Sequence, residues 1–335
     1  MNRKIVKIIL IILVILIILG LLYYVISDLK SNFASNMKRD GFDVLLPDKD
    51  ICTISIDGDT LWAGGASGLF EIDMKSFTAK NVGDYKFIRA VLAVDGGLWL
   101  GSDDGLTYIG EKTINYTVKE GLPDNRVNAI ILDKDKRLWV GTWGGVAVFD
   151  GEKIKTYTKK DGLLDNMVNV IMQDSADGMW FGSYVAPRGG ISVLYNEKWQ
   201  YFTTNDALLH ANINAIIERQ DKSIIAGGGL YNKGGATRFV FQSDKWVKNG
   251  TITKKDGLAG EKVRSLFEDS NNRLWFGSEY DGLAVMSENK IIKLTKKNGL
   301  SNDEVKVIRE DESNNIWVGT RKGLIRINKG GIDNE

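Results

Sequence analysis

The sequence predicts an all-β fold, a seven-bladed β-propeller with four-stranded blades, and three observations carry this prediction. One pattern recurs seven times at intervals of about 37 to 50 residues, a period typical of solenoids, propellers and arrays. Each copy consists of short runs rich in β-branched and aromatic residues, separated by Gly, Asp and Asn, as expected of strands joined by turns. No run of about 10–12 residues within the copies carries a capped, apolar helical stripe, which disfavours helix-pair repeats.

The clearest copy of the repeat begins at Arg137 and ends at Asp174. The strand-length runs of one unit are Val127–Leu132, Leu138–Thr142, Val146–Phe149 and Lys153–Thr158. Four short antiparallel strands per repeat form the blade of a β-propeller. The seven copies align on a Trp that precedes a Gly and is replaced once by Ile, at Trp62, Trp99, Trp139, Trp180, Ile225, Trp275 and Trp317.

Three residue types within the repeat have mechanical explanations. An Asp that follows an inner strand is expected to bind the backbone of a tight turn. The Gly after the Trp lies within a strand pattern, which predicts either a bulge or the close approach of a neighbouring blade. The Trp is expected to fill the wedge between adjacent blades, because a large ring suits the gap between splayed sheets. The four turn residues are Asp133, Asp174, Asp269 and Asp311.

The repeat pattern resembles the two-component regulator propeller repeat. The residues that carry the resemblance in one copy are Gly121, Leu122, Asn125, Val127, Ile130, Asp133, Leu138, Trp139, Gly141, Thr142 and Gly145. The pattern recurs from Gly162 and, less completely, from Gly257 and Gly299, so that it covers roughly residues 50 to 328. The resemblance implies the extracytoplasmic sensor part of a bacterial membrane-bound kinase. Since no kinase sequence follows Asn328, we expect signalling to pass through a partner protein.

The first 40 residues differ in composition from the rest. Residues 5–26 are apolar except for Lys7, and about 20 such residues span a bilayer. We therefore expect a cytoplasmic tip at residues 1–4, a transmembrane helix at 5–26 and a polar tether at 27–40. Arg3, Lys4 and Lys7 crowd the N-terminal flank, so the positive-inside rule predicts a single-pass membrane protein with a cytoplasmic N-terminus and an extracytoplasmic propeller.

The propeller is expected to occupy residues 41–328, followed by a tail at 329–335. The last copy ends without its outermost strand. The run Asp43–Leu46 precedes the first inner strand and could supply it. We predict that this strand closes the ring, because closure removes exposed sheet edges.

Composition limits the possible functions. The chain has 44 basic and 43 acidic residues, a balance that gives no reason to expect nucleic-acid binding. Cys52 is the single cysteine; it permits no internal disulfide and is expected to be a small core residue.

The spacing of the repeat is similar to that of streptogramin lyases, in which histidines and a metal carry the chemistry, but this chain has one histidine, His210. No motif for a metal or cofactor is recognisable, so a propeller lyase or hydrolase is the least favoured function.

Binding is expected at the mouth of the central channel, on the face built by the loops between second and third strands and by those that enter the inner strands. Two of the former are longer than the rest, Ser183–Gly190 and Gly228–Gly235, and insertions on one face of a repeat protein tend to mark its binding side. The candidate ligand-binding residues are Trp143, Tyr184, Arg188, Tyr231, Lys233, Tyr280, Arg321, Asp103, Asp104 and His210.

Aromatic and Arg side chains suit a small molecule, a glycan or a peptide, whereas the alternative is that these are solvated loop residues. The first functional hypothesis is a ligand-binding sensor module that signals through a membrane partner. The second is a protein-interaction scaffold in the cell envelope with no small ligand. A concave mouth rich in aromatic and charged groups would favour the sensor, and a flat or plugged mouth would favour the scaffold.

Overall fold

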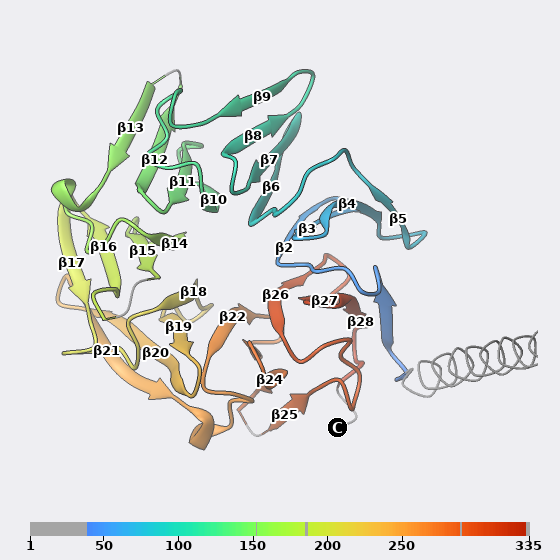
Figure 1. Cartoon of the computed structure of the whole chain (residues 1–335). Helices are drawn as coiled ribbons and strands as arrows, with labels where there is room; N and C mark the ends of the chain where they lie inside the picture. Colours follow the sequence, from blue (N-terminus) through green and yellow to red (C-terminus); the bar gives the residue numbers. More distant parts are fainter. Residues whose placement is uncertain (1–38, 152, 185–186, 289, 333–335) are drawn as a thin grey trace, which may run out of the picture.

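The computed structural model describes residues 39–151, 153–184, 187–288 and 290–332. Seven antiparallel sheets of four strands each are arranged around a central axis (Figure 1). This arrangement confirms the predicted seven-bladed propeller of four-stranded blades. Within each blade the innermost strand lies beside the axis and the outermost strand lies at the rim.

Six blades consist of four consecutive strands. Blades one and two are β2 (Thr53–Asp57), β3 (Thr60–Gly65), β4 (Gly68–Asp73), β5 (Thr78–Asn81), β6 (Ala90–Val94), β7 (Gly97–Gly101), β8 (Leu106–Ile109) and β9 (Thr113–Tyr116). Blades three and four are β10 (Val127–Leu132), β11 (Leu138–Thr142), β12 (Gly145–Asp150), β13 (Lys153–Tyr157), β14 (Val168–Gln173), β15 (Met179–Ser183), β16 (Ile191–Tyr195) and β17 (Lys198–Phe202). Blades five and six are β18 (Ile213–Glu218), β19 (Ile224–Leu230), β20 (Lys233–Gln242), β21 (Lys245–Ile252), β22 (Val263–Glu268), β23 (Leu274–Ser278), β24 (Leu283–Met286) and β25 (Ile291–Leu294). Two single-turn 3-10 helices, η1 (Lys159–Asp161) and η2 (Lys254–Asp256), follow outer strands.

The seventh blade joins the two ends of the propeller. It consists of β26 (Val305–Glu310), β27 (Ile316–Thr320), β28 (Gly323–Ile327) and, as its outermost strand, β1 (Phe42–Leu45). β1 pairs antiparallel with β28, with Phe42 opposite Ile327 and Leu45 opposite Leu324 (Figure 1). The strand expected just before the first inner strand therefore lies where it completes the last blade.

The acidic turns are bound to the Trp of the same blade as well as to the turn backbone. In blade three, Oδ1 of Asp133 accepts hydrogen bonds from the backbone N–H groups of Asp135 and Arg137, as the sequence predicted. Its Oδ2 accepts a further bond from Nε1 of Trp139, at 2.8 Å. The same indole bond, at 2.7–2.8 Å, joins Trp180 to Asp174, Trp275 to Asp269 and Trp317 to Asp311.

The blades that lack this Asp also differ at the Trp. In blade five, Arg219 occupies the Asp position and Ile225 the Trp position, and Arg219 instead pairs with Glu268 of the next blade. Blades one and two have shorter turns, and their Trp62 and Trp99 are only half-buried. The fully packed Trp and the Asp that accepts its indole bond therefore occur together in blades three, four, six and seven, because a buried indole N–H normally has an acceptor.

The Gly after the Trp allows the next blade to approach. A Cβ added at Gly101 would lie 2.5 Å from a methyl carbon of Val127 on the next inner strand. The corresponding distances are 2.7 Å from Gly182 to Ile213 and 2.5 Å from Gly227 to Val263. Real Cβ atoms do not approach side chains this closely, so these positions require Gly. The predicted close approach is confirmed.

The predicted transmembrane segment and tether lie almost entirely outside the described residues, which begin at residue 39. Among the residues that the structure does describe, none belongs to a helix with the length and apolar character needed to cross a bilayer.

Candidate functional site

One residue from each inner strand, or from the position just before it, lines the central channel. In β10, β14, β18, β22 and β26 this residue is skipped in the pairing with the second strand. Such a bulge re-aims a side chain, here toward the channel. In order around the axis, this channel ring consists of Cys52, Arg89, Asn128, Asn169, Asn214, Arg264 and Lys306.

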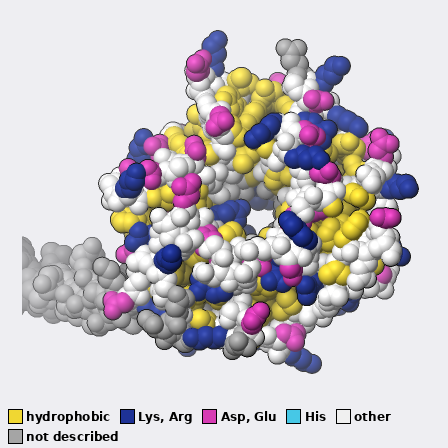
Figure 2. All heavy atoms as spheres, turned by 180° about the vertical axis from the view of Figure 1, so that it is seen from behind, with side chains coloured by type: hydrophobic (Ala, Val, Ile, Leu, Met, Phe, Trp, Pro, Cys, Tyr) yellow, Lys and Arg dark blue, Asp and Glu magenta, His cyan; other side chains and the backbone are white. Residues whose placement is uncertain are grey.

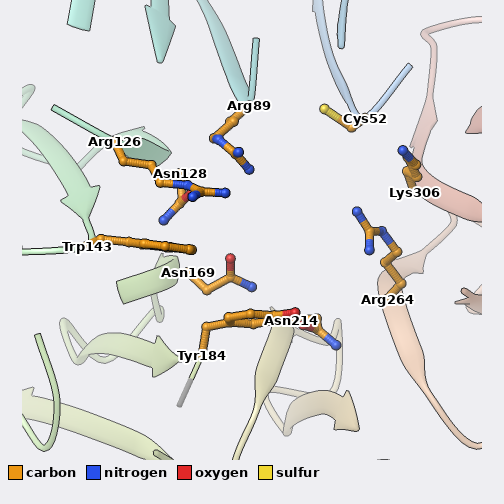
Figure 3. A pocket seen from close by; sticks show the side chains of 10 residues that line it. All are labelled: Cys52, Arg89, Arg126, Asn128, Trp143, Asn169, Tyr184, Asn214, Arg264 and Lys306. Carbon is orange, nitrogen blue, oxygen red and sulfur yellow. The ribbon is translucent and has the colours of Figure 1, made fainter. Parts of the chain in front are cut away.

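The channel ring forms the floor of a cavity of about 420 Å³ at one end of the channel. Arg126, Trp143 and Tyr184 complete its wall. Figure 3 shows Trp143 and Tyr184 on one side of the open space and Arg264 and Lys306 on the other. Small-molecule sites are typically concave and roughly 300–1,000 Å³ in size, so the cavity is large enough for a ligand.

Three asparagines form one arc of the channel ring, and their amides all have the same orientation. Nδ2 of Asn128 donates to the carbonyl of Val168 in the next blade, at 3.1 Å. Asn169 and Asn214 make the equivalent bonds to the following blades, at 3.1 and 2.9 Å. The amide nitrogens thus join neighbouring blades. Among the described residues nothing donates to the three Oδ1 atoms, which remain available as acceptors.

The opposite arc of the channel ring is cationic, and each cation is held from behind by a carboxylate. Nε of Arg89 lies 2.6 Å from Oδ1 of Asp103. Nη1 of Arg264 lies 2.8 Å from Oε2 of Glu279, and Nζ of Lys306 lies 2.7 Å from Oδ2 of Asp50. No Asp or Glu of the described residues lines the cavity itself.

The same charge pattern continues further into the channel. A second space of about 270 Å³ shares all seven residues of the channel ring, and its lining in the described part of the chain also contains no carboxylate. Arg309 joins the wall there, with its Nη1 donating to the carbonyl of Ile308 at 2.7 Å. Burial lowers the pKa of Arg309. Figure 2 shows the opening at the centre of the ring, with Lys and Arg side chains beside it.

Arg126 links the cationic arc to the aromatic side of the cavity. Its guanidinium carbon lies 3.5 Å from the centre of the Trp143 ring, a cation–π contact. Its Nε is buried, lies 3.3 Å from Oδ1 of Asp103, and has no hydrogen-bond partner among the described residues. Desolvation and the nearby charge of Arg89 lower the pKa of Arg126.

Cys52 lies in the channel wall, which corrects the expectation of a core position. It is half-buried, and its Sγ donates to the carbonyl of Ile88 at 3.0 Å. The apolar run around it suggested burial, but Cys52 occupies the channel-ring position while its neighbour Ile51 packs in the core. Desolvation raises the pKa of the thiol to about 11.

This raised pKa predicts slow thiol chemistry. Because the thiolate is the nucleophile, we expect iodoacetamide to alkylate Cys52 about 10- to 100-fold more slowly at pH 8 than it alkylates an ordinary cysteine, with the rate rising toward pH 11. Mass spectrometry of the single cysteine measures the rate. The same chain unfolded in urea is the control, and equal rates in the two states would contradict the prediction.

The other predicted site residues lie outside the cavity lining. Arg188, Tyr231, Tyr280 and Arg321 are exposed on loops, Tyr231 at 72%, and Lys233 is exposed at the start of β20. Tyr280 donates its hydroxyl to Glu279, and Arg321 lies 3.7 Å from Glu304. Of the ten predicted residues, the structure brings only Trp143 and Tyr184 to the cavity.

Asp103 and the histidine have partners near the cavity but do not line it. Asp103 holds Arg89 from behind the cavity, and both Asp103 and Asp104 are exposed. Nδ1 of His210 accepts a bond from the backbone N–H of Asn212 at 3.0 Å. Burial, followed by the charge of Lys233, lowers the pKa of His210.

Sequence reasoning missed the channel ring, although the repeat alignment contained a signal for it. Each of its members directly follows an aliphatic residue at the start of the inner strand, as Asn128 follows Val127 and Arg264 follows Val263. Comparing the residue at this one position in all seven copies of the repeat would have identified the members of the channel ring. The described part of the chain contains no group of three His, Cys, Asp or Glu residues able to hold a metal ion.

Comparison with known proteins agrees with the repeat pattern. The family model described as "Two component regulator propeller" matches residues 121–144, 162–185, 257–280 and 299–322. These are the four copies that begin at the Gly residues identified in the sequence. A search of curated proteins gave no match.

Several solved structures share the fold. The extracellular domain of a protein described as a hybrid two component system from B. thetaiotaomicron superposes with a TM-score of 0.73 at 22% identity, covering 88% of this chain and 42% of that chain. A second such domain from the same organism gives 0.70 at 18% identity, covering 86% and 39%. Virginiamycin B lyase from Staphylococcus aureus gives 0.64 at 14% identity, covering 85% and 98%. The chain thus spans about two fifths of the two extracellular domains. Its four matched segments are two component regulator propeller repeats.

Proposed function

We propose that this chain is the recognition module of a bacterial sensor system. The propeller lies outside the cytoplasm on a single N-terminal membrane anchor, binds a small ligand in the cavity at the channel mouth, and passes its occupancy to a signalling partner. The fold that it shares with the extracellular domains described as parts of two component systems supports this role.

The observation that carries the proposal is the cavity above the channel ring. It is concave and lined by two aromatic rings, four cations and three amides. Among the described residues, Nε of Arg126 is buried without a hydrogen-bond partner, and the three asparagines use only Nδ2 in their bonds to the next blade. Because buried polar groups normally have partners, such a wall favours a ligand over the flat or plugged mouth expected of a scaffold.

The proposal is tested by measuring the melting temperature of the full-length chain with neutral, anionic and cationic sugars, amino acids and short peptides. A ligand that binds only the native state raises the melting temperature. At a concentration 100 times its Kd it adds about 2.7 kcal/mol to the free energy of unfolding. We expect a shift with at least one class, accompanied by a change in fluorescence of the nine tryptophans. A panel without any shift would favour the envelope scaffold instead.

Two variants locate the binding. Tyr184→Ala removes a ring from the cavity wall and is expected to weaken binding at least tenfold. Tyr231→Ala removes a ring on the same face that is 72% exposed and outside the cavity, and serves as the matched control. Equal losses in both variants would contradict a site in the cavity.

A further inference from the structure

We propose that the cavity selects a small polyhydroxylated anion, a molecule that carries a carboxylate or phosphate at one end and several hydroxyls at the other. This inference rests on the proposed function and specifies the class of its ligand. It follows from the division of the channel ring into a donor arc of Arg89, Arg264 and Lys306 and an acceptor arc of Asn128, Asn169 and Asn214.

The donor arc suits an anion because its guanidinium groups have donors to spare. An Arg side chain carries five N–H donors. The hydrogen bonds of Arg264 within the described residues involve Nη1 alone, and those of Arg89 involve Nε and Nη2. The carboxylates behind fix these side chains without lining the cavity. The remaining donors form a preorganised, charged wall, and a cleft lined by one sign of charge attracts the opposite one.

The acceptor arc suits hydroxyl groups. The bonds from Nδ2 of the three asparagines to the next blade hold each amide in one orientation. Their Oδ1 atoms can therefore accept but not donate. A hydroxyl is able to donate to such an oxygen, whereas a carboxylate or a phosphate dianion is not. A simple inorganic anion would thus satisfy only the cationic half of the channel ring.

The shape and the aromatic groups of the cavity limit the size of the ligand. Its volume of about 420 Å³ falls toward the lower end of small-molecule sites. Trp143 and Tyr184 form one side of the wall (Figure 3), and aromatic faces contact the apolar side of a sugar-sized ring. A compact ligand can therefore reach both arcs and one aromatic face at once.

Binding of four matched probes to the full-length chain tests this inference by titration calorimetry. D-Glucuronate and D-glucose 6-phosphate carry both an anion and hydroxyls, and they separate a carboxylate from a phosphate ligand. D-Glucose has the hydroxyls without the charge, and cyclohexanecarboxylate has the charge without the hydroxyls. We expect at least one of the first two to bind at least tenfold more tightly than either of the others, and its affinity to fall with added salt.

Single variants then test which arc binds the anionic group of the ligand and which arc binds its hydroxyls. Arg264→Gln is expected to weaken the hydroxylated anion about 10- to 100-fold, because it removes a charge-assisted hydrogen-bond donor, while Glu279 keeps Lys262 as a partner. Asn169→Ala is expected to weaken the hydroxylated anion but to leave cyclohexanecarboxylate unchanged. Arg321→Gln makes the same charge change on the same face, outside the cavity, and is the control. Melting curves without ligand verify that each variant folds.

The outcomes distinguish this inference from the broader proposal. If neutral or cationic probes bind in a manner that depends on Tyr184 and the hydroxylated anions do not, the anion inference is overturned and ligand recognition stands. If neither hydroxylated anion binds at tens of millimolar, the inference is likewise overturned. If no probe of any class binds, ligand recognition fails with it. Equal loss in Arg264→Gln and Arg321→Gln would show that general surface charge, and not the channel ring, attracts the anion.

Discussion

Replacing Asp133 with Ala is expected to lower the free energy of unfolding by about 3–5 kcal/mol, a typical cost of removing one partner from a buried charged network. The Asp133 side chain is 0% exposed and accepts bonds from two backbone N–H groups, from Nε of Arg137 and from the indole of Trp139. Without the carboxylate, the indole N–H has no acceptor in the blade interior. Equilibrium unfolding in urea, followed by tryptophan fluorescence, measures the change.

The matched control for this variant lies in the same turn. Asp135 is two residues away, its side chain is 57% exposed, and its ion pair is with Nη2 of Arg137 at 3.3 Å. Because exposed pairs contribute about 0–1 kcal/mol, Asp135→Ala is expected to have little effect. A cost for Asp133→Ala no larger than that for Asp135→Ala would show that the buried bonds do not stabilise the blade.

Deleting β1, residues 42–45, is expected to lower the melting temperature by about 10–20 °C. The deletion removes the buried side chains of Phe42 and Leu45, and losing a buried Phe alone costs about 3–5 kcal/mol. In a domain of this size the melting temperature falls by about 2–4 °C for each kcal/mol of lost stability. A loss of about 5 kcal/mol therefore gives the expected fall of about 10–20 °C. The deletion also exposes the edge of β28, so we expect aggregation at high protein concentration. Calorimetry and light scattering measure the two effects.

Point variants separate strand loss from a change in chain length. Phe42→Ala keeps the strand but removes its main core contact, and is expected to cost about 3–5 kcal/mol. Val44 lies in the same strand and is 52% exposed, so Val44→Ala is expected to be nearly neutral. An unchanged melting temperature after deletion of β1 would mean that the ring does not depend on this closure.

The spacing and composition of the repeats were sufficient to predict most of the fold. A repeat length of about 40 residues and four strand-like runs define a blade independently of the neighbouring blades. The seven blades could therefore be identified from the sequence. The incomplete last copy pointed to a strand near residue 43 as its missing partner. The acidic turns were also predictable, because Asp133 binds the backbone within four residues of itself. These are local properties of the chain.

The candidate site was less predictable from sequence. Trp143 and Tyr184 were recognised because aromatic residues in mouth loops stand out, but Tyr231 and Tyr280 stand out equally and lie outside the cavity. Arg264 and Asn169 look like ordinary polar residues at the start of strands. Only the bulge at their position shows that both side chains line one channel.

The repeat, the number of blades, the acidic turns and the strand that completes the ring can be read from the sequence alone, because periodicity, turn chemistry and strand patterns act over short stretches. The three-dimensional arrangement was needed to show that Cys52 lies in the channel and that cations and amides occupy opposite arcs of one ring. It was also needed to show that the indoles of Trp139, Trp180, Trp275 and Trp317 donate to the preceding Asp. The members of that ring are separated in sequence by whole blades. They meet because closure of the ring brings one position of every inner strand to the same axis.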